Sequence, residues 1–226
     1  MNILVVAAHP DDELLGCGGT AARLAREGHS VYMAILGEGV TSRHVRRENV
    51  DVSALENLRT CSQRVADLLG AKELSLHGLP DNRFDSLPLL DIIKIVEELI
   101  ERWRPTAIYT HHGGDLNVDH QMVSRAVLTA TRPVKGHPVR ELYMFEIASS
   151  TEWAFQQLSP VFKPNVFVDI EHTLSLKLEG MRLYESEARE FPHPRSSEAL
   201  TAIARRWGSV VGQNAAEAFE AVRLIR

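Results

Sequence analysis

Two short segments of the chain bring histidine and aspartate side chains together. The first, His9-Pro10-Asp11-Asp12-Glu13, follows directly after the apolar run from Ile3 to Ala8, and the second is Asp119-His120. A nucleotide-binding turn would carry glycines at the first place, because a backbone without side chains can approach a pyrophosphate. Consecutive carboxylates there would repel phosphate, so the residue types favour a site for a cation.

The same side chains suit a hydrolytic metal site. His9 offers an imidazole and Asp12 a carboxylate three residues later, around a proline that stiffens the turn. With His120 they make two imidazoles and one carboxylate, a ligand set that leaves a position open. When the metal is zinc, such a set lowers the pKa of a bound water toward ~7. Asp11 is left over beside these ligands and could act as a base toward that water.

A structural interpretation of these residues has equal support from their spacing alone. A single histidine at a strand end is usually a hydrogen-bonding residue, and acidic residues at a helix start complement the helix dipole. The glycines Gly16, Gly18 and Gly19 follow the carboxylates instead of occupying the turn. We therefore expect them inside the first helix, where it packs closely on the sheet, and not around a dinucleotide.

The elements that must position these residues alternate between apolar strands and amphipathic helices. This alternation predicts a single α/β domain over residues 1–226, with a mostly parallel sheet between two layers of helices. Ligands gather at the carboxyl ends of such strands, where His9 and the loop 111–117 both fall. The expected strands are 3–8, 30–36, 73–76, 107–110, 142–147 and 166–170, and the expected helices are 14–26, 52–69, 88–102, 118–131 and 173–187.

Length and composition limit the class of protein. The chain has 226 residues, 44% of them hydrophobic and 24% charged, which is ordinary for one globular domain. Its formal net charge of -5 argues against a nucleic-acid partner. No apolar segment approaches the ~20 residues that cross a bilayer, and the start of the chain lacks a basic leader. We expect a soluble, cytoplasmic protein that binds neither membranes nor nucleic acids.

Two motifs resemble those of one enzyme family. AHPDDE follows the first strand and GDLNVDH follows a later one, the second inside a longer H-x-x-G-D-x-N-x-D-H pattern that ends at His120. The two motifs resemble those of the LmbE-like (PIG-L) family of zinc-dependent N-acetyl sugar deacetylases. The match in order and spacing extends over most of the chain, including TEWAF, YESEAREFPHPRS and AEAFEAVRLI. The resemblance implies a Rossmann-like three-layer α/β/α fold, a Zn2+ ion, and hydrolysis of an acetamido group on a small N-acetylated sugar. It also implies a homo-oligomer, either a trimer or a hexamer.

The resemblance also assigns roles to single residues. Carried over position by position, it makes His9, Asp12 and His120 the zinc ligands and Asp11 the general base. Asp11 would take a proton from the attacking water and return it to the leaving amine. Asp119 could orient a neighbouring imidazole or donor, because carboxylates behind metal ligands commonly fix such groups. Two imidazoles and a carboxylate accept several metals, so another divalent ion could replace zinc in the cell.

One position departs from the family pattern. Many members have a histidine three residues before the last ligand, where it helps to stabilise the oxyanion, but this chain has Asn117 there. Asparagine can donate a hydrogen bond but carries no positive charge, and losing an oxyanion donor typically costs ~3 kcal/mol. His193 in FPHPRS is the candidate for that role, because some members supply a late histidine, in some cases across a subunit contact. The alternative is that His193 and its flanking prolines only shape a surface turn.

Substrate-binding residues are expected in three places. Arg59 could anchor a sugar hydroxyl or a phosphate, as a family arginine near this place does, although the local spacing departs from the family by about one residue. Asp81 and Arg83, in the LPDNRF loop, are candidates for contacts with sugar hydroxyls, the alternative being that both are simply solvated. The arginines of the basic loop 43–47 could bind phosphate or could simply be solvated.

Three functions are therefore in competition. The first is a zinc-dependent hydrolase that removes the N-acetyl group from an N-acetylated amino-sugar, such as an N-acetylglucosamine-type glycoside or a nucleotide-linked sugar. The second keeps the metal but hydrolyses an amide in a non-sugar N-acyl metabolite. The third is a non-catalytic Rossmann-like binding module in which the carboxylates only cap helices. The third predicts no bound metal and no loss of function in Asp11→Asn.

Overall fold

Seven strands form one sheet in the computed structural model, which describes residues 1–43 and 50–226. The strand order is β3-β2-β1-β4-β5-β7-β6. The neighbours from β3 to β5 pair in parallel, and β7 runs antiparallel to both β5 and β6. The strands are β1 (Asn2–Ala7), β2 (Ser30–Gly37), β3 (Glu73–Leu79), β4 (Ala107–His111), β5 (Glu141–Phe145), β6 (Val166–Asp169) and β7 (Ala216–Leu224).

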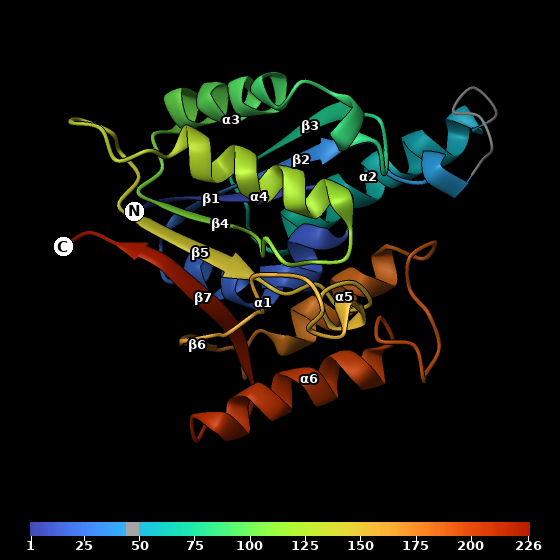
Figure 1. Cartoon of the computed structure of the whole chain (residues 1–226). Coiled ribbons are helices and arrows are strands. Elements are labelled where there is room, and N and C mark those ends of the chain that lie inside the picture. Colours follow the sequence, from blue (N-terminus) through green and yellow to red (C-terminus); the bar gives the residue numbers. More distant parts are fainter. Residues whose placement is uncertain (44–49) are drawn as a thin grey trace.

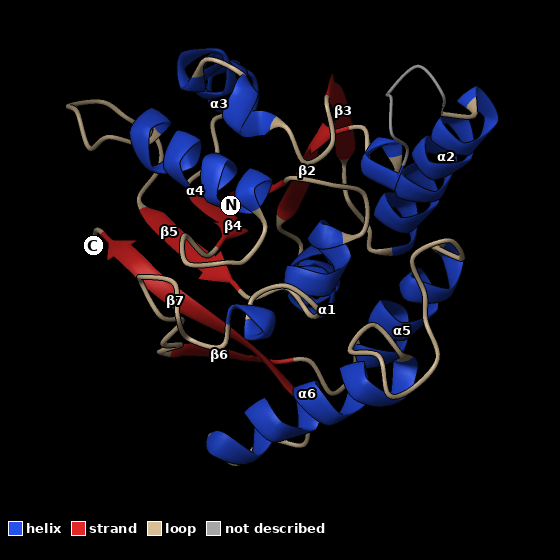
Figure 2. Cartoon of the chain, turned by 45° about the vertical axis from the view of Figure 1, so that its right-hand side comes forward, coloured by secondary structure: helices blue, strands red, loops and turns tan. Residues whose placement is uncertain are grey.

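Helices cover both faces of this sheet. Figure 1 shows α3 and α4 side by side over one face, whereas α1, α5 and α6 lie beyond the other. The turned view in Figure 2 keeps the same separation and places α2 next to α1 and α5. The helices are α1 (Asp12–Arg26), α2 (Val52–Leu68), α3 (Leu89–Trp103), α4 (Val118–Ala130), α5 (Leu174–Leu183) and α6 (Ser197–Val210), with short 3-10 turns η1 (Thr41–Arg43), η3 (Phe84–Ser86) and η4 (Glu152–Ala154).

The alternation of side chains along β1 explains the two layers. Leu4 and Val6 point into a core formed with α3 and α4, whereas Ile3 and Val5 belong to the core formed with α1, α2 and α5. All four side chains are at most 3% exposed, because successive residues of a strand face opposite sides of a sheet. The predicted three-layer α/β/α fold with a mostly parallel sheet is therefore confirmed.

The glycines of α1 do serve close packing. A Cβ atom on Gly16 would lie 2.6 Å from Cγ of Phe145, and one on Gly19 would lie 2.9 Å from Cδ1 of Ile170. The helix is also broken at Cys17, whose φ of -150° is not helical. The buried carboxylate of Glu217 accepts the N–H groups of Gly19 and Thr20, which follow this break, at 3.0 and 2.7 Å. These contacts fix the helix whose first turn carries the acidic residues.

Two elements near the end of the chain were not predicted. α6 and the antiparallel strand β7 fall in a stretch to which the sequence pattern assigned no element. In β7, the acidic Glu217 and Glu220 interrupt the apolar pattern, and Glu217 is buried because Lys177 pairs with it at 2.6 Å. Among the described helices, none is long and apolar enough to cross a membrane.

The two histidine-aspartate segments meet where the order of the strands reverses. From β1 the chain proceeds to β2 and β3 on one side of the sheet, and then returns to place β4 on the other side of β1. His9 follows the carboxyl end of β1, and the segment 112–120 follows the carboxyl end of β4. Such a reversal leaves a crevice outside the strand ends, which is where ligands bind in open α/β sheets.

Candidate metal centre and active site

The turn after β1 is held in a tight and unusual conformation. The backbone N–H of His9 donates to Oδ2 of Asp12 at 2.8 Å, and the N–H of Asp12 donates back to the carbonyl of His9 at 3.2 Å. Between them, Asp11 has a φ of 99°, in the left-handed region that residues with a side chain rarely adopt. The turn therefore fixes where the side chains of His9, Asp11 and Asp12 point.

His120 reaches the same place from the first turn of α4. Asn117 caps this helix, since its side chain accepts the N–H of Asp119 at 2.8 Å. Nε2 of His120 lies 3.1 Å from Oδ2 of Asp12, and Nδ1 of His9 lies 3.3 Å from the same oxygen. One ligand atom from each of His9, Asp12 and His120 lies within 4.8 Å of the others, so these side chains could hold a metal ion.

A carboxylate also lies behind each imidazole. Oδ2 of Asp119 is 2.9 Å from Nε2 of His9, and Oδ1 of Asp115 is 3.0 Å from Nδ1 of His120. Burial alone would raise the pKa of Asp115, but the ring of His120 and the hydroxyls of Ser150 and Thr151 lower this pKa to about 2. Such carboxylates set the orientation and the basicity of metal-binding histidines.

The charges of the site fit a cation. Burial disfavours the charged form of His120, yet the carboxylates of Asp12 and Asp115 raise its pKa to about 9. Asp11, Asp12, Asp115 and Asp119 are each at most 2% exposed, and buried carboxylates need a compensating charge. Imidazole and carboxylate donors with an open position are also the donor set of zinc hydrolases, so a divalent ion fits here.

Asp11 lies in the same cavity but outside the candidate ligand group. The cavity has a volume of about 160 Å³, and its lining includes His9, Asp11, Asp12 and His120. Burial raises the pKa of Asp11, although the guanidinium of Arg195, whose Nη1 donates to Oδ2 of Asp11 at 2.6 Å, opposes that effect. A carboxylate at this place can accept a proton from a water in the cavity.

The other predicted residues divide between the cavity and the surface. Asn117 and Asp81 line the cavity, and the Asn117 amide donates to Oδ1 of Asn82 at 3.0 Å. Asp81 is only 4% exposed and lies 3.3 Å from Nε2 of His9. Arg59 and Arg83 are exposed and do not line this cavity as the described residues form it. The basic loop 43–47 lies largely outside the described residues.

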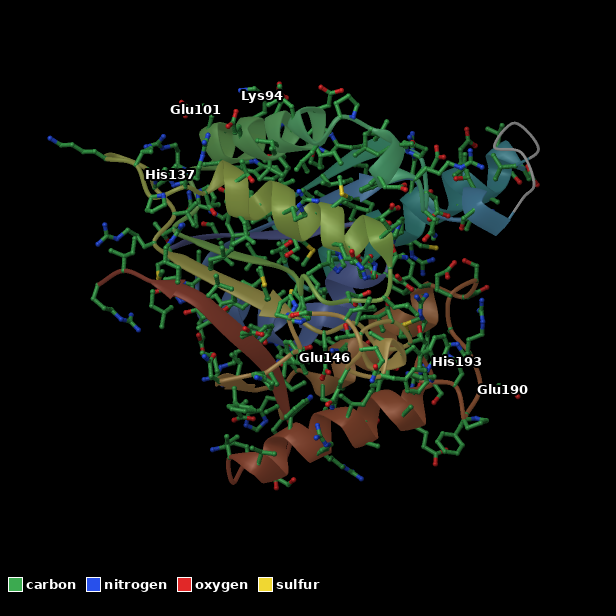
Figure 3. The ribbon with its side chains drawn as sticks, viewed as in Figure 1. Lys94, Glu101, His137, Glu146, Glu190 and His193 are labelled. Carbon is green, nitrogen blue, oxygen red and sulfur yellow. The ribbon has the colours of Figure 1, made fainter. Side chains whose placement is uncertain are left out.

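His193 does not reach the cavity within its own chain. It lies on the connection between α5 and α6, together with Glu190 (Figure 3). Its Nδ1 accepts the backbone N–H of Arg195 at 3.1 Å, and its ring stands edge-on to Trp153 at 5.6 Å. These contacts match the surface-turn alternative for a single chain, and a contribution across a subunit contact stays a prediction.

Sequence reasoning gave no role to two buried or half-buried residues of the site, Arg195 and Asp115, and it placed a third, His111, only in the loop 111–117. Arg195 contacts Asp11, Asp115 contacts His120, and His111 stacks on His120 with ring centroids 4.0 Å apart. Nε2 of His111 accepts the N–H of Ala8 at 2.8 Å, so His111 also joins β4 to the end of β1. Asp115 lies in the motif GDLNVDH and Arg195 in YESEAREFPHPRS, but the spacing of these motifs does not indicate which side chain either residue contacts.

Comparison with known proteins agrees with this geometry. A family model described as PIG-L: GlcNAc-PI de-N-acetylase matches residues 4–131, which include His9, Asp12 and His120. The chain belongs to the PIG-L family. This match spans the turn after β1 and the first turn of α4, so it includes both segments that build the candidate metal centre.

Similar proteins cover most of the PIG-L chain. The uncharacterized deacetylase YaiS of Escherichia coli is 28% identical over 191 residues, which is 82% of this chain and 91% of YaiS. The diacetylchitobiose deacetylase of Thermococcus kodakarensis is 26% identical over 234 aligned positions, covering 96% of this chain and 81% of that protein. The crystal structure of GalB, the 4-carboxy-2-hydroxymuconate hydratase of Pseudomonas putida KT2440, has a TM-score of 0.73 at 19% identity, covering 98% of this chain and 95% of GalB. The fold alone therefore does not fix the reaction.

Proposed function

We propose that this PIG-L chain is a zinc-dependent hydrolase that removes the N-acetyl group from an N-acetylated amino-sugar. The observation that carries the proposal is the place of Asp11, a buried carboxylate that shares a small polar cavity with His9, Asp12 and His120. A metal-ligand group with a free carboxylate beside it is the arrangement that amide hydrolysis by an activated water requires. The deacetylases among the similar proteins support the choice of the acetamido group.

In the proposed mechanism, His9, Asp12 and His120 would hold zinc, and Asp119 and Asp115 keep the two imidazoles in place. A bound zinc ion would supply a Lewis acid for the acetyl carbonyl and would acidify the attacking water. Asp11 accepts the proton of that water as its oxygen attacks the carbonyl carbon. Asp11 then donates the proton to the amine nitrogen as the C–N bond breaks, which releases acetate and the free amine.

Contacts with the rest of the substrate are proposed for the polar wall of the cavity. Asp81 accepts from the hydroxyl of Ser42 at 2.7 Å and from the amide of Asn82 at 2.9 Å, so a sugar hydroxyl would join an existing network. The amide of Asn117 also lines the cavity, and we propose it as a donor to the developing oxyanion. Arg59 and Arg83 would contact only parts of a substrate that extend beyond the cavity.

Two further properties are proposed from the resemblance to the family. We propose that the chain works in the cytoplasm as a homo-oligomer, a trimer or a hexamer, in which His193 of one subunit could complete the site of another. Mixed oligomers of His193→Ala and Asp11→Asn subunits test this sharing, because only shared sites would recover activity on mixing. No recovery in mixtures would restrict His193 to the surface turn.

The experiment that tests the function measures the free amine released from a panel of N-acetyl compounds. The panel contains N-acetylglucosamine, N,N'-diacetylchitobiose, UDP-N-acetylglucosamine and, as non-sugar amides, N-acetyl amino acids. We expect the wild type to cleave a sugar substrate, and Asp11→Asn to lose about 100-fold to 10,000-fold in kcat, as expected for a general base. Asp85→Asn, at an exposed position in η3, is the matched control and should keep full activity.

Each result separates the competing functions. Preference for the N-acetyl amino acids would favour the non-sugar amide hydrolase. Zinc-free wild type that cleaves nothing would favour the binding module. Full activity in Asp11→Asn would show that another group is the base.

A further inference from the structure

Arg195 joins three segments of the chain at the edge of the cavity. Its Nη1 donates to Oδ2 of Asp11 at 2.6 Å and lies 3.3 Å from Oε2 of Glu187, and its Nε donates to the hydroxyl of Ser149 at 2.8 Å. The side chain is 22% exposed, so most of it is removed from solvent. A planar guanidinium can bind several acceptors at once in a fixed geometry, which a lysine cannot.

Two of these partners have strained backbones. Asp11 has a φ of 99° and Ser149 a φ of 71°, and both residues carry a side chain in a region that favours glycine. Such conformations are energetically unfavourable and persist only where the surroundings hold them. Arg195 binds the side chains of both residues, so one guanidinium contributes to holding both strained positions.

The carboxylate and the backbone of Asp11 are held from different sides. The N–H of Asp11 donates to Oε2 of Glu13 at 3.1 Å, and the hydroxyl of Tyr184 donates to Oε1 of Glu13 at 2.6 Å. The carboxylate end of Asp11 is held by Arg195 through Oδ2. A contact with one carboxylate oxygen restricts the direction of the other oxygen, because both are bonded to the same carbon.

The contact with Ser149 extends the effect of Arg195 to the metal centre. Ser149 is followed by Ser150, whose hydroxyl donates to the carboxylate of Asp115. Asp115 lies 3.0 Å from Nδ1 of His120, so the segment 149–150 links Arg195 to the carboxylate behind one candidate metal ligand. The guanidinium therefore contacts both the proposed base and the segment that braces a proposed ligand.

We propose that Arg195 is a positioning residue, which fixes Asp11 in the direction of the attacking water relative to the metal centre. The assignment rests on the proposed deacetylase function. Arg195 takes no proton and forms no bond with substrate in this role, and it acts through Asp11. A purely structural arginine in the same place would stabilise the fold or the metal site without a selective effect on the chemical step.

The test compares Arg195→Ala, Arg195→Lys and Ser149→Ala in the zinc-loaded protein, with the panel substrate that the wild type cleaves fastest. We expect Arg195→Ala to lose about 100-fold in kcat, the effect of a misplaced catalytic group, with a nearly unchanged KM. Added guanidinium ion should restore part of the kcat of Arg195→Ala. Arg195→Lys should lose less, because its ammonium can replace one contact but not the planar set.

Arg189→Ala is the matched control from the same connection. Arg189 is exposed, and its Nη1 donates to the backbone carbonyls of Ser186 and Ala188, so its removal tests the connection without touching Asp11. Zinc content and Tm are measured for every variant. We expect zinc content to stay at the wild-type level in Arg195→Ala, Arg195→Lys and Arg189→Ala.

The outcomes are distinguishable. An active wild type with unchanged kcat in Arg195→Ala overturns the assignment and leaves the proposed function standing. If Arg195→Ala does not fold, full kcat in Arg195→Lys overturns the assignment. A loss of zinc from Arg195→Lys and Ser149→Ala that accounts for their lost activity also overturns the assignment. A wild type that cleaves no member of the panel overturns the proposed function, and the role of Arg195 with it.

Discussion

Asp119 and His9 are 110 residues apart in the chain, yet Oδ2 of Asp119 lies 2.9 Å from Nε2 of His9. The same carboxylate also accepts the backbone N–H groups of Asn82 and Phe84, at 2.6 and 2.9 Å. Asp119 thus links the segment after β3 to the ring of His9, and its carboxylate hydrogen-bonds Nε2 of that ring. The other ring nitrogen, Nδ1, is left facing Asp12, which is the orientation a shared metal ion would need.

Removing one imidazole of the candidate centre should remove the metal. We expect wild-type protein purified without added metal to contain about one zinc per chain, and His120→Ala to contain little, because the candidate site loses one of its three protein ligands. Elemental analysis of the purified proteins measures this directly. His172→Ala, at an exposed position, is the control and should keep its zinc. Equal zinc in His120→Ala and wild type would remove His120 from the ligand set.

Metal binding should stabilise the folded chain. A ligand that binds the native state and not the unfolded chain stabilises the native state by about 2.7 kcal/mol when its concentration is about 100 times its Kd. For a chain of this size we expect chelation to lower Tm by about 5 to 10 °C, and added zinc to restore it. Differential scanning calorimetry with and without chelator measures the shift. In His120→Ala, the chelator should change Tm little.

Asp115 should control how tightly the metal binds. Its carboxylate lies behind His120, and losing such a partner typically weakens metal affinity about 10-fold to 100-fold. We expect Asp115→Asn to bind zinc more weakly in a competition titration with a chromogenic chelator, while keeping its fold by circular dichroism. Unchanged zinc affinity in Asp115→Asn would mean that Asp115 does not tune the metal site and only holds its loop, where it accepts the hydroxyls of Ser150 and Thr151.

Asp115 should also contribute to acid sensitivity in metal-free protein. Its folded-state pKa of about 2 lies below the ordinary value of 3.8, so its contribution to stability is present above the unfolded pKa and is lost as the pH falls. Between pH 5 and pH 3, we expect the free energy of unfolding of Asp115→Asn to fall by about 1 kcal/mol less than that of the wild type. Urea unfolding of chelator-treated protein at the two pH values measures the difference. An equal fall in both proteins would contradict the prediction.

The close approach of α1 to β5 should make Gly16 intolerant of a methyl group. A Cβ atom there would meet the ring of Phe145, a buried side chain in a packed core, so we expect Gly16→Ala to destabilise the protein by about 1–3 kcal/mol. Urea unfolding gives the value. Gly78→Ala is the matched control, because the atom nearest to a Cβ atom at this position would be Nη2 of Arg59 at 3.9 Å. Similar stability in the two variants would mean that Phe145 moves aside at little cost.

Hydrophobic patterning was enough to predict most of the fold. The apolar run of β1 and the helical spacing of α3 survive in the structure almost to the residue, because both elements bury a regular set of side chains. β7 could not be predicted in this way, since it places Glu217 in the interior against Lys177. A buried ion pair between distant residues has no periodicity in the sequence.

The sequence by itself determined which residue types stand after β1 and β4, and hence that His9, Asp12 and His120 would meet at one edge of a parallel sheet. The tertiary structure alone decided what surrounds them. Arg195 reaches Asp11 across 184 positions of the chain, whereas the neighbouring His193 turns to Trp153. The strand order brings the ends of β1 and β4 together for any chain with this topology. The contact of one side chain with another depends on the path of the connection between α5 and α6, which local sequence patterns do not encode.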